Sequence, residues 1–476
     1  MAGLASASVP AANSKICAGA ARRGFAARVE AFLVRHRRHV VLLQLAMLVL
    51  FVALIVLPPL LPAPASGAGI LANFPRFAGF VIWGAWFPLV FLSVILAGRS
   101  WCGLLCPMGA ASEWANRLGP KWPIPRWVRW PGTPLVSFIL VTIWSQTAGA
   151  RAHPLATAIV FGGIFSAALS LGFLFGRKKR AWCRHVCPIG LLLGVYSRLG
   201  ALEFRPKRPQ PGGDLWTERT VCPTMIDLDR KTESRHCIAC SRCVSPQAKG
   251  GLALRLRKPG EEVAAIREHH PNLSEVLFLF MGTGAALGGF LWLVLPFYQN
   301  LRRALGDWAI GHGWLWIGNP GPVFLMANYP LAREVFRWID FLLITGFMLG
   351  TTAIATIVMG IATGAQAWLS GRLGGDRGFG ERFIELGYQF LPVAMVSLLL
   401  GLGTKLFAAL ALFGESAVAI EVLKAALFAA GWLWSLGLGE RQLARQGLTR
   451  RRRWFAMLPG VLASTLIGAA WVPAVF

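Results

Sequence analysis

Charged residues are scarce in this sequence, and acidic ones are the scarcest. Asp, Glu, Lys and Arg make up 14% of the 476 residues, with 21 acidic against 48 basic side chains. Water-soluble domains carry about 25% charged residues, so the composition excludes that class. The eight histidines all lie in tails, in connections or at the ends of apolar segments. Their placement excludes a transmembrane haem held by two histidines.

Several cofactor and catalytic motifs are also absent. No Cys-x-x-Cys-His sequence is present to attach a c-type haem. The glycine-rich stretch 282–289 lies in an apolar segment and follows no strand, so it does not read as a dinucleotide-binding loop. No nucleophile with a neighbouring base stands out. The sequence therefore favours a component of a larger system over a stand-alone enzyme.

Apolar residues dominate instead, at 55%, with 20 tryptophans and a mean hydropathy of +0.56. A helix needs roughly 20 apolar residues to cross the hydrocarbon core of a bilayer. We expect an all-α polytopic membrane protein with about nine transmembrane helices. The third is the weakest, because it is short and contains Gln146, and a re-entrant segment is the alternative there. The nine stretches lie near residues 40–57, 77–97, 135–150, 155–175, 276–296, 340–363, 386–408, 417–438 and 455–474.

The basic residues are distributed unevenly between the two sides of this arrangement. The connections on one side hold 40 Lys and Arg, and those on the other side hold 6. The positive-inside rule then predicts a bacterial inner-membrane protein with a cytoplasmic N-terminus and, after nine crossings, a periplasmic C-terminus. The net charge of +27 reflects this topology rather than nucleic-acid binding. A small-residue site at 60–65 leaves signal-peptide cleavage as an alternative for the first segment.

Two copies of a W-C-x3-C-P-x-G motif follow the second and fourth apolar stretches, at residues 101–109 and 182–190. Each copy follows an arginine, Arg99 or Arg180. Two thiols cannot complete the four-thiolate shell of a [4Fe–4S] cluster, but two motifs related by a pseudo-twofold axis can. We predict one cluster held by four cysteines; a zinc site with the same sulfurs, or packing cysteines without a ligand, are the alternatives. The predicted ligands are Cys102, Cys106, Cys183 and Cys187.

A second cysteine group lies downstream of these motifs. Cys237, Cys240 and Cys243 have the C-x2-C-x2-C spacing of bacterial ferredoxins. The usual fourth cysteine is replaced by Gln247, and Cys222 with the proline after it supplies a fourth thiol from upstream. We predict a second [4Fe–4S] cluster here, with a zinc knuckle as the alternative. The predicted topology places all these cysteines, with Cys17 of the tail, on the reducing side, which favours cofactor ligation over disulfides.

The chain divides into four predicted parts. They are a basic cytoplasmic tail (1–39), helices one to four with the first motif (40–175), a cytoplasmic loop with the second motif and a small ferredoxin-like iron–sulfur segment (176–275), and helices five to nine (276–476). Lys405 and Glu421 fall at similar depth in the predicted spans seven and eight. They suggest either a Lys–Glu pair in a polar pocket for quinone or protons, or snorkelling side chains with an i,i+3 pair between Glu421 and Lys424.

The twin motifs followed by a ferredoxin-like group resemble the NapH and NosR type of membrane-bound polyferredoxin, over about residues 70–250. This resemblance implies two [4Fe–4S] clusters that link the quinone pool or the cytoplasmic side to a periplasmic redox partner. NapH-like proteins usually have four spans, whereas this chain has five further predicted spans. It also has no room before the second span for the external flavin-binding domain of NosR-like proteins.

The stretch 101–114 and the long C-terminal half are also similar to the polyferredoxin that accompanies Ftr-type ferrous iron permeases. That likeness implies a cupredoxin-like partner, an iron permease nearby, and electrons accepted from ferrous iron during uptake. A NapH-like quinol-oxidising donor to a periplasmic reductase is the alternative, and a quinone is a further candidate ligand. A transporter or scaffold with structural metal sites is the alternative of another class.

Overall fold

The computed structural model describes residues 24–62, 69–176, 179–207, 221–244, 251–411 and 414–475. Cys17, Gln247 and most of the small-residue site at 60–65 lie outside these residues. Helices dominate the described part, and eight of them are long and apolar enough to cross a membrane. They are His39–Leu60, Phe74–Ala97, Pro154–Leu174, Leu273–Val294, Trp338–Arg372, Phe379–Leu402, Ala417–Arg445 and Arg450–Val475.

Several of these spans are built from shorter elements. The first joins α2 (His39–Val56) to a 3₁₀ turn, and the second joins α3 (Phe74–Phe80) to α4 (Phe87–Ala97) through a π-helical segment. The sixth joins α15 (Phe379–Gly387) to α16 (Leu391–Leu402). The remaining spans are single helices, α8 (Pro154–Leu174), α12 (Leu273–Val294), α14 (Trp338–Arg372), α18 (Ala417–Arg445) and α19 (Arg450–Val475).

The predicted third span is α7 (Thr133–Thr147), which at 15 residues is shorter than a usual crossing. Its first turn nevertheless reaches the cysteine-bearing end of the molecule, because Pro134 lines the same cavity as Cys183. At its other end Thr147 Oγ1 donates a hydrogen bond to the carbonyl oxygen of Leu325, at 2.9 Å. The helix therefore joins the two ends of the bundle. Within the described residues, eight helices are long enough to cross a membrane against the nine expected, and α7 is one of two shorter apolar helices.

Three of the shorter helices begin at a proline. Pro107 and Pro188 each stand at the first position of a helix, where the missing N–H costs no hydrogen bond. The short helices are α1 (Phe25–Arg35), α5 (Pro107–Leu118), α6 (Arg126–Arg129), α9 (Ala181–His185), α10 (Pro188–Tyr196), α11 (Glu261–Ala264), α13 (Pro296–Gly311) and α17 (Thr404–Leu410).

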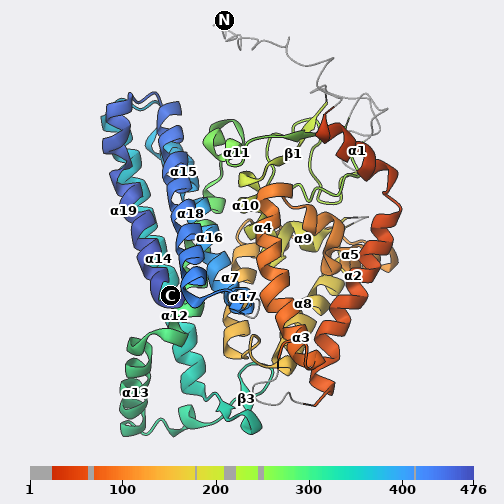
Figure 1. The fold of residues 1–476 in the computed structure, drawn as a ribbon, viewed down its shortest axis with the longest axis vertical. Coiled ribbons are helices and arrows are strands. Elements are labelled where there is room, and N and C mark those ends of the chain that lie inside the picture. The colour runs from red at the N-terminus through yellow and green to blue at the C-terminus, as the bar shows by residue number, and fades with distance from the viewer. Residues whose placement is uncertain are drawn as a thin grey trace, which may run out of the picture.

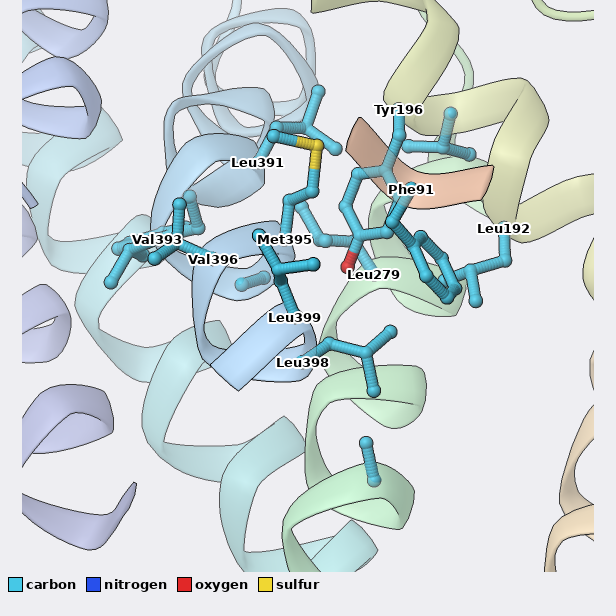
Figure 2. Close-up of a cluster of buried hydrophobic side chains, with 14 of the residues drawn as sticks. Phe91, Leu192, Tyr196, Leu279, Leu391, Val393, Met395, Val396, Leu398 and Leu399 are labelled. Carbon is cyan, nitrogen blue, oxygen red and sulfur yellow. The ribbon is translucent and has the colours of Figure 1, made fainter. Parts of the chain in front are cut away.

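The N-terminal helices pack on one side of the bundle and the C-terminal helices α14 to α19 on the other (Figure 1). The segment around α1 and β1 lies at one end, and α13 and β3 lie at the opposite end. Helices α12 and α16 are the most deeply buried spans. Figure 2 shows their joint with the N-terminal half, where Tyr196 and Phe91 face Met395 and Leu399. A continuous apolar core thus connects the two halves.

Strands are few. β1 (Leu202–Pro206) pairs antiparallel with β2 (Leu252–Leu256), and β3 (Asn328–Tyr329) pairs with β4 (Glu334–Val335). The first ribbon packs beside the downstream cysteine group, because Phe204 and Leu252 share an apolar cluster with Cys222 and Cys243. These elements do not by themselves show a ferredoxin fold. The ferredoxin-like segment expected here rests on its cysteine spacing.

The charged pair suggested for the C-terminal spans does not form. Lys405 lies in α17, beyond the end of the sixth long helix, and its Nζ donates to the carbonyl oxygen of Arg151 at 3.1 Å. Glu421 instead pairs with Lys424 at 2.8 Å, as the i,i+3 alternative predicted. The Lys405–Glu421 interpretation is therefore wrong, because Gly403 ends the preceding helix and redirects the chain.

Candidate metal centres

The second cysteine of each motif has the same local structure, although Trp101–Leu105 is π-helical and Ala181–His185 is α-helical. The backbone N–H of Cys106 donates to the carbonyl oxygen of Trp101, and that of Cys187 donates to Trp182, both at 2.9 Å. Each of these cysteines then caps the N-terminus of a helix whose first residue is proline, α5 or α10. The repeat seen in the sequence is thus a repeat of backbone conformation at the second cysteine, and it presents the second thiol of each motif at a helix start.

The structure brings the four motif cysteines to one place. A methyl group on Gly109, the last residue of the first motif, would lie 3.1 Å from the Sγ atom of Cys183 in the second. Burial raises the pKa of the Cys183 thiol to about 12; Arg180 opposes this effect, and the negative charges of Cys106 and Cys102 add to it. Thiolates held this close in a buried site need a cation or cluster to compensate their charge.

Two arginines supply positive charge around this first cysteine set. Arg180 is fully buried and its Nη1 donates to the carbonyl oxygen of Cys102 at 2.9 Å. Arg99 is 3% exposed and donates to the carbonyl oxygen of Arg235 at 2.5 Å. Among the described residues, Arg99 Nε and Nη2, Arg180 Nη2 and Trp182 Nε1 are buried without an acceptor. An anionic iron–sulfur cluster in this position would supply acceptors for such groups.

The second cysteine set lines a cavity of its own. Its walls include Cys222, Cys237, Cys240 and Cys243, together with apolar side chains of the neighbouring loop. Ala239 and Ser241 have left-handed φ values of 49° and 57°, which turn the backbone sharply between successive cysteines. The backbone N–H groups of Ala239 and Arg242 donate to the sulfurs of Cys237 and Cys240, and these bonds partly offset the pKa increase that burial causes in both thiols.

The two sets adjoin through a carboxylate and two arginines. Glu113 of α5 accepts from Arg180 Nε at 2.7 Å and from Arg242 Nη1 at 2.5 Å. Burial alone would raise the pKa of the Glu113 carboxyl, but Arg242 and Arg180 lower it below its ordinary value. Arg180 belongs to the first site and Arg242 to the loop of the second. Glu113 therefore holds the two sites in fixed relation.

No group of three or more His, Cys, Asp or Glu side chains within the described residues is close enough to hold a single metal ion. A zinc ion would draw four sulfurs to about 2.3 Å from one centre. In a [4Fe–4S] cluster each thiolate binds a different iron atom, so the thiolates lie further apart. The donor set of four cysteine thiols is the one that such a cluster requires.

An apolar cavity of about 160 Å³ extends from the first cysteine set into the bundle. Cys187, Pro188 and Met108 lie at the end near the motifs, and helices α4, α7, α8, α12 and α16 form its walls. Polar side chains also line it, namely Thr142, Ser145, Gln146 and Arg151. Sequence reasoning missed this cavity, because residues from seven segments of the chain line it.

Two segments of the chain, 80–125 and 157–208, match a family described as 4Fe-4S binding domain. Each segment contains one copy of the motif. Three relatives are similar to this region. An uncharacterized protein of Methanocaldococcus jannaschii is 26% identical over 166 residues, which is 33% of this chain and 65% of that protein. NirI of Paracoccus denitrificans is 30% identical over 34% of this chain and 26% of its own length.

The ferredoxin-type protein NapH of Escherichia coli is 25% identical over 39% of this chain and 70% of its own length. The chain thus spans less than two thirds of the first two relatives. No solved structure matches it. The matched segments, the twin motifs and the apolar helices all support the same family likeness. In the segments 80–125 and 157–208, this chain is similar to the NapH/NosR type of membrane-bound 4Fe-4S ferredoxin-type proteins.

Proposed function

We propose that this protein binds two [4Fe–4S] clusters and transfers electrons between the quinone pool and the cytoplasmic side of a bacterial inner membrane. The first cluster would be held by Cys102, Cys106, Cys183 and Cys187, and the second by Cys222, Cys237, Cys240 and Cys243. Each cluster, when bound, would take up and release one electron at a time. The orphaned N–H groups of Arg99 and Arg180 support this ligand set, since they would face a negatively charged group.

The apolar cavity beside Cys187 is the observation that favours quinone. Its aromatic and aliphatic walls suit a ring with an isoprenoid tail. Gln146 and Arg151 line the cavity and could hydrogen-bond a ring oxygen, while Cys187 lies in its wall near the first cysteine set. Arg151 also donates to Thr404 Oγ1 at 3.0 Å and lies 5.1 Å from the centre of the Phe290 ring. Both contacts would hold its guanidinium in place.

In the test, the protein is purified anaerobically and its iron, acid-labile sulfide and zinc contents are measured. Quinol is then added, and reduction of the clusters is followed by EPR. Leu192 lines the cavity and is buried, so Leu192→Trp should fill it. Leu140 is 62% exposed on α7, so Leu140→Trp is the matched control. We expect decylubiquinol to reduce the wild type and Leu140→Trp, and to reduce Leu192→Trp slowly although that variant keeps its iron. Zinc without acid-labile sulfide, as a structural scaffold requires, would contradict the proposal.

A second candidate is electron exchange with a periplasmic redox protein, either a cupredoxin-like partner as in ferrous iron uptake or a reductase. A separate pocket at the end opposite the cysteines favours this candidate. Arg76, Arg151, His153 and Lys405 line that pocket, and an acidic protein surface would complement them. Neighbouring genes for an iron permease and a cupredoxin would support the iron-uptake version. A neighbouring nitrate reductase gene would count against it.

A further inference from the structure

A separate basic cavity of about 160 Å³ lies beside the first cysteine set and is open to solvent. Cys183 of the second motif forms part of its wall. Four arginines and two histidines line it: Arg99, Arg129, Arg184, Arg235, His185 and His236. None of its described lining residues is acidic. The cavity is therefore strongly positive and lies next to a predicted iron–sulfur ligand.

Much of this positive charge has no local counter-charge. Arg235 is paired with Glu275 and lies 3.3 Å from Glu233. Arg99, Arg129 and Arg184, by contrast, form no ion pair with any residue that the structure describes. Nη1 of Arg184 is buried and lacks an acceptor, and it is not among the groups assigned to the first cluster. A buried donor without an acceptor destabilises the fold, and a bound anion would remove that cost.

The first cysteine set accounts for only part of this charge. Arg99 repeats the position of Arg180 relative to its motif, and both act on the Cys183 thiol. Arg129 has no such counterpart. It lies in α6, outside both motifs, and its side chain is exposed toward solvent. An anion that enters from solvent would meet Arg129 first and the buried arginines next.

The lining indicates the class of anion. Guanidinium groups bind phosphate through paired, charge-assisted hydrogen bonds. Trp130, 58% exposed, lines the same cavity and offers a flat aromatic face for a planar ring. A phosphate, a planar ring and one-electron exchange occur together in flavin mononucleotide. A nicotinamide transfers hydride, so it does not exchange single electrons with an iron–sulfur site directly.

We propose that this cavity binds the phosphate of a flavin mononucleotide-type electron carrier, with its ring against Trp130 and beside Cys183. No covalent bond forms. When bound, a reduced flavin would give its two electrons one at a time to the oxidised first [4Fe–4S] cluster, which passes each on before taking the next, and would release two protons to solvent. The role of the flavin as a carrier rests on the proposed electron-transfer function. The binding site itself does not depend on that function.

The test is an anaerobic fluorescence titration of the purified full-length protein in detergent. The probes are flavin mononucleotide and riboflavin, which carries the same ring without the phosphate. We expect flavin mononucleotide to bind at least tenfold more tightly than riboflavin, and inorganic phosphate to compete with it. Arg129→Gln should weaken its binding at least tenfold. Arg126→Gln, an exposed arginine of the same short helix that does not line the cavity, should leave binding unchanged.

Equal affinity for both flavins, or equal binding by the Arg129→Gln and Arg126→Gln variants, would overturn the proposal. The iron content of each variant is measured in parallel, so a loss of binding through misfolding is recognised. The titration involves no electron transfer. Failure of quinol to reduce the clusters, with flavin binding intact, would count against the proposed function alone. The opposite pattern would count against this cavity alone.

Discussion

Gly103 of the first motif lies directly against the backbone of Cys240 in the second cysteine set. A methyl group on Gly103 would lie 2.8 Å from the amide nitrogen of Cys240 and 2.1 Å from the carbonyl oxygen of Ile238. Nonbonded atoms do not approach so closely, and both neighbours are backbone atoms that side-chain rotation cannot move. The absence of a side chain at this position is what lets the two cysteine sets adjoin.

Gly103→Ala should therefore displace the loop 237–243 and impair the second site. We expect roughly half of the bound iron and acid-labile sulfide to be lost, because each site would hold one of two equal clusters. Iron analysis and EPR measure this loss. Gly162→Ala in α8 is the control, since nothing lies within 4 Å of the added methyl group. Equal iron content in the two variants would contradict the packing described.

Loss of one ligand from each motif should remove the same cluster. Cys106→Ser and Cys187→Ser are expected to abolish one common EPR signal, and Cys237→Ser to abolish a different one. Cys17→Ser, in the tail outside the described residues, is the control and should retain both signals. An intact signal in either motif variant would show that the four thiols do not share a cluster.

Glu113→Gln should weaken the contact between the two sites. Glu113 is 6% exposed, and its removal leaves the fully buried Arg180 without a carboxylate partner. Breaking such a pair costs about 3–5 kcal/mol, and the lower value applies because Arg242 is partly exposed. The melting temperature in detergent should fall. The reduction potential of the nearer cluster should also rise, because one negative charge is lost.

Glu421→Gln is the matched control for that variant. Its pair with Lys424 lies in α18, and the Glu421 side chain is 46% exposed. Exposed pairs contribute about 0–1 kcal/mol, so stability and potentials should stay near those of the wild type. If Glu113→Gln behaved like Glu421→Gln, the bridging role of Glu113 would be refuted.

The pH dependence of stability should show the buried network around Glu262. Burial alone would raise the pKa of the Glu262 carboxyl, but Arg198 and Arg257 lower it to about 2. Because the folded-state pKa lies below the unfolded value, the stabilisation is complete above about pH 4.5 and is lost as pH falls toward 2. The difference corresponds to roughly 3 kcal/mol.

Thermal unfolding between pH 3 and 7 measures this effect. Glu262→Gln should be less stable than the wild type at pH 7 and should show a flatter pH profile. Glu261→Gln, at the preceding residue, is the control. The Glu261 side chain is 40% exposed, and its carboxylate lies 3.6 Å from the guanidinium of Arg255. A profile for Glu262→Gln as steep as that of the wild type would refute the assignment.

Hydropathy was sufficient to locate the eight long helices, because a bilayer imposes a minimum length on apolar segments. It failed where helices are short. The apolar helix Pro188–Leu199 lies inside the stretch expected to be a cytoplasmic loop, and α7 is shorter than its predicted span. The ion pairs could not be predicted from the sequence either, since Glu113 and Arg242 are 129 residues apart along the chain. Arg99 and Arg180 did carry a signal: each stands two residues before its motif tryptophan.

The equivalent hydrogen bonds from Cys106 to Trp101 and from Cys187 to Trp182 show that the two motifs contribute equivalent groups to the first site. Each half of the repeat contributes two thiols, one arginine and one helix start to the same place. One half alone would present an incomplete shell. Both copies of the repeat must therefore fold together before either can complete a ligand shell.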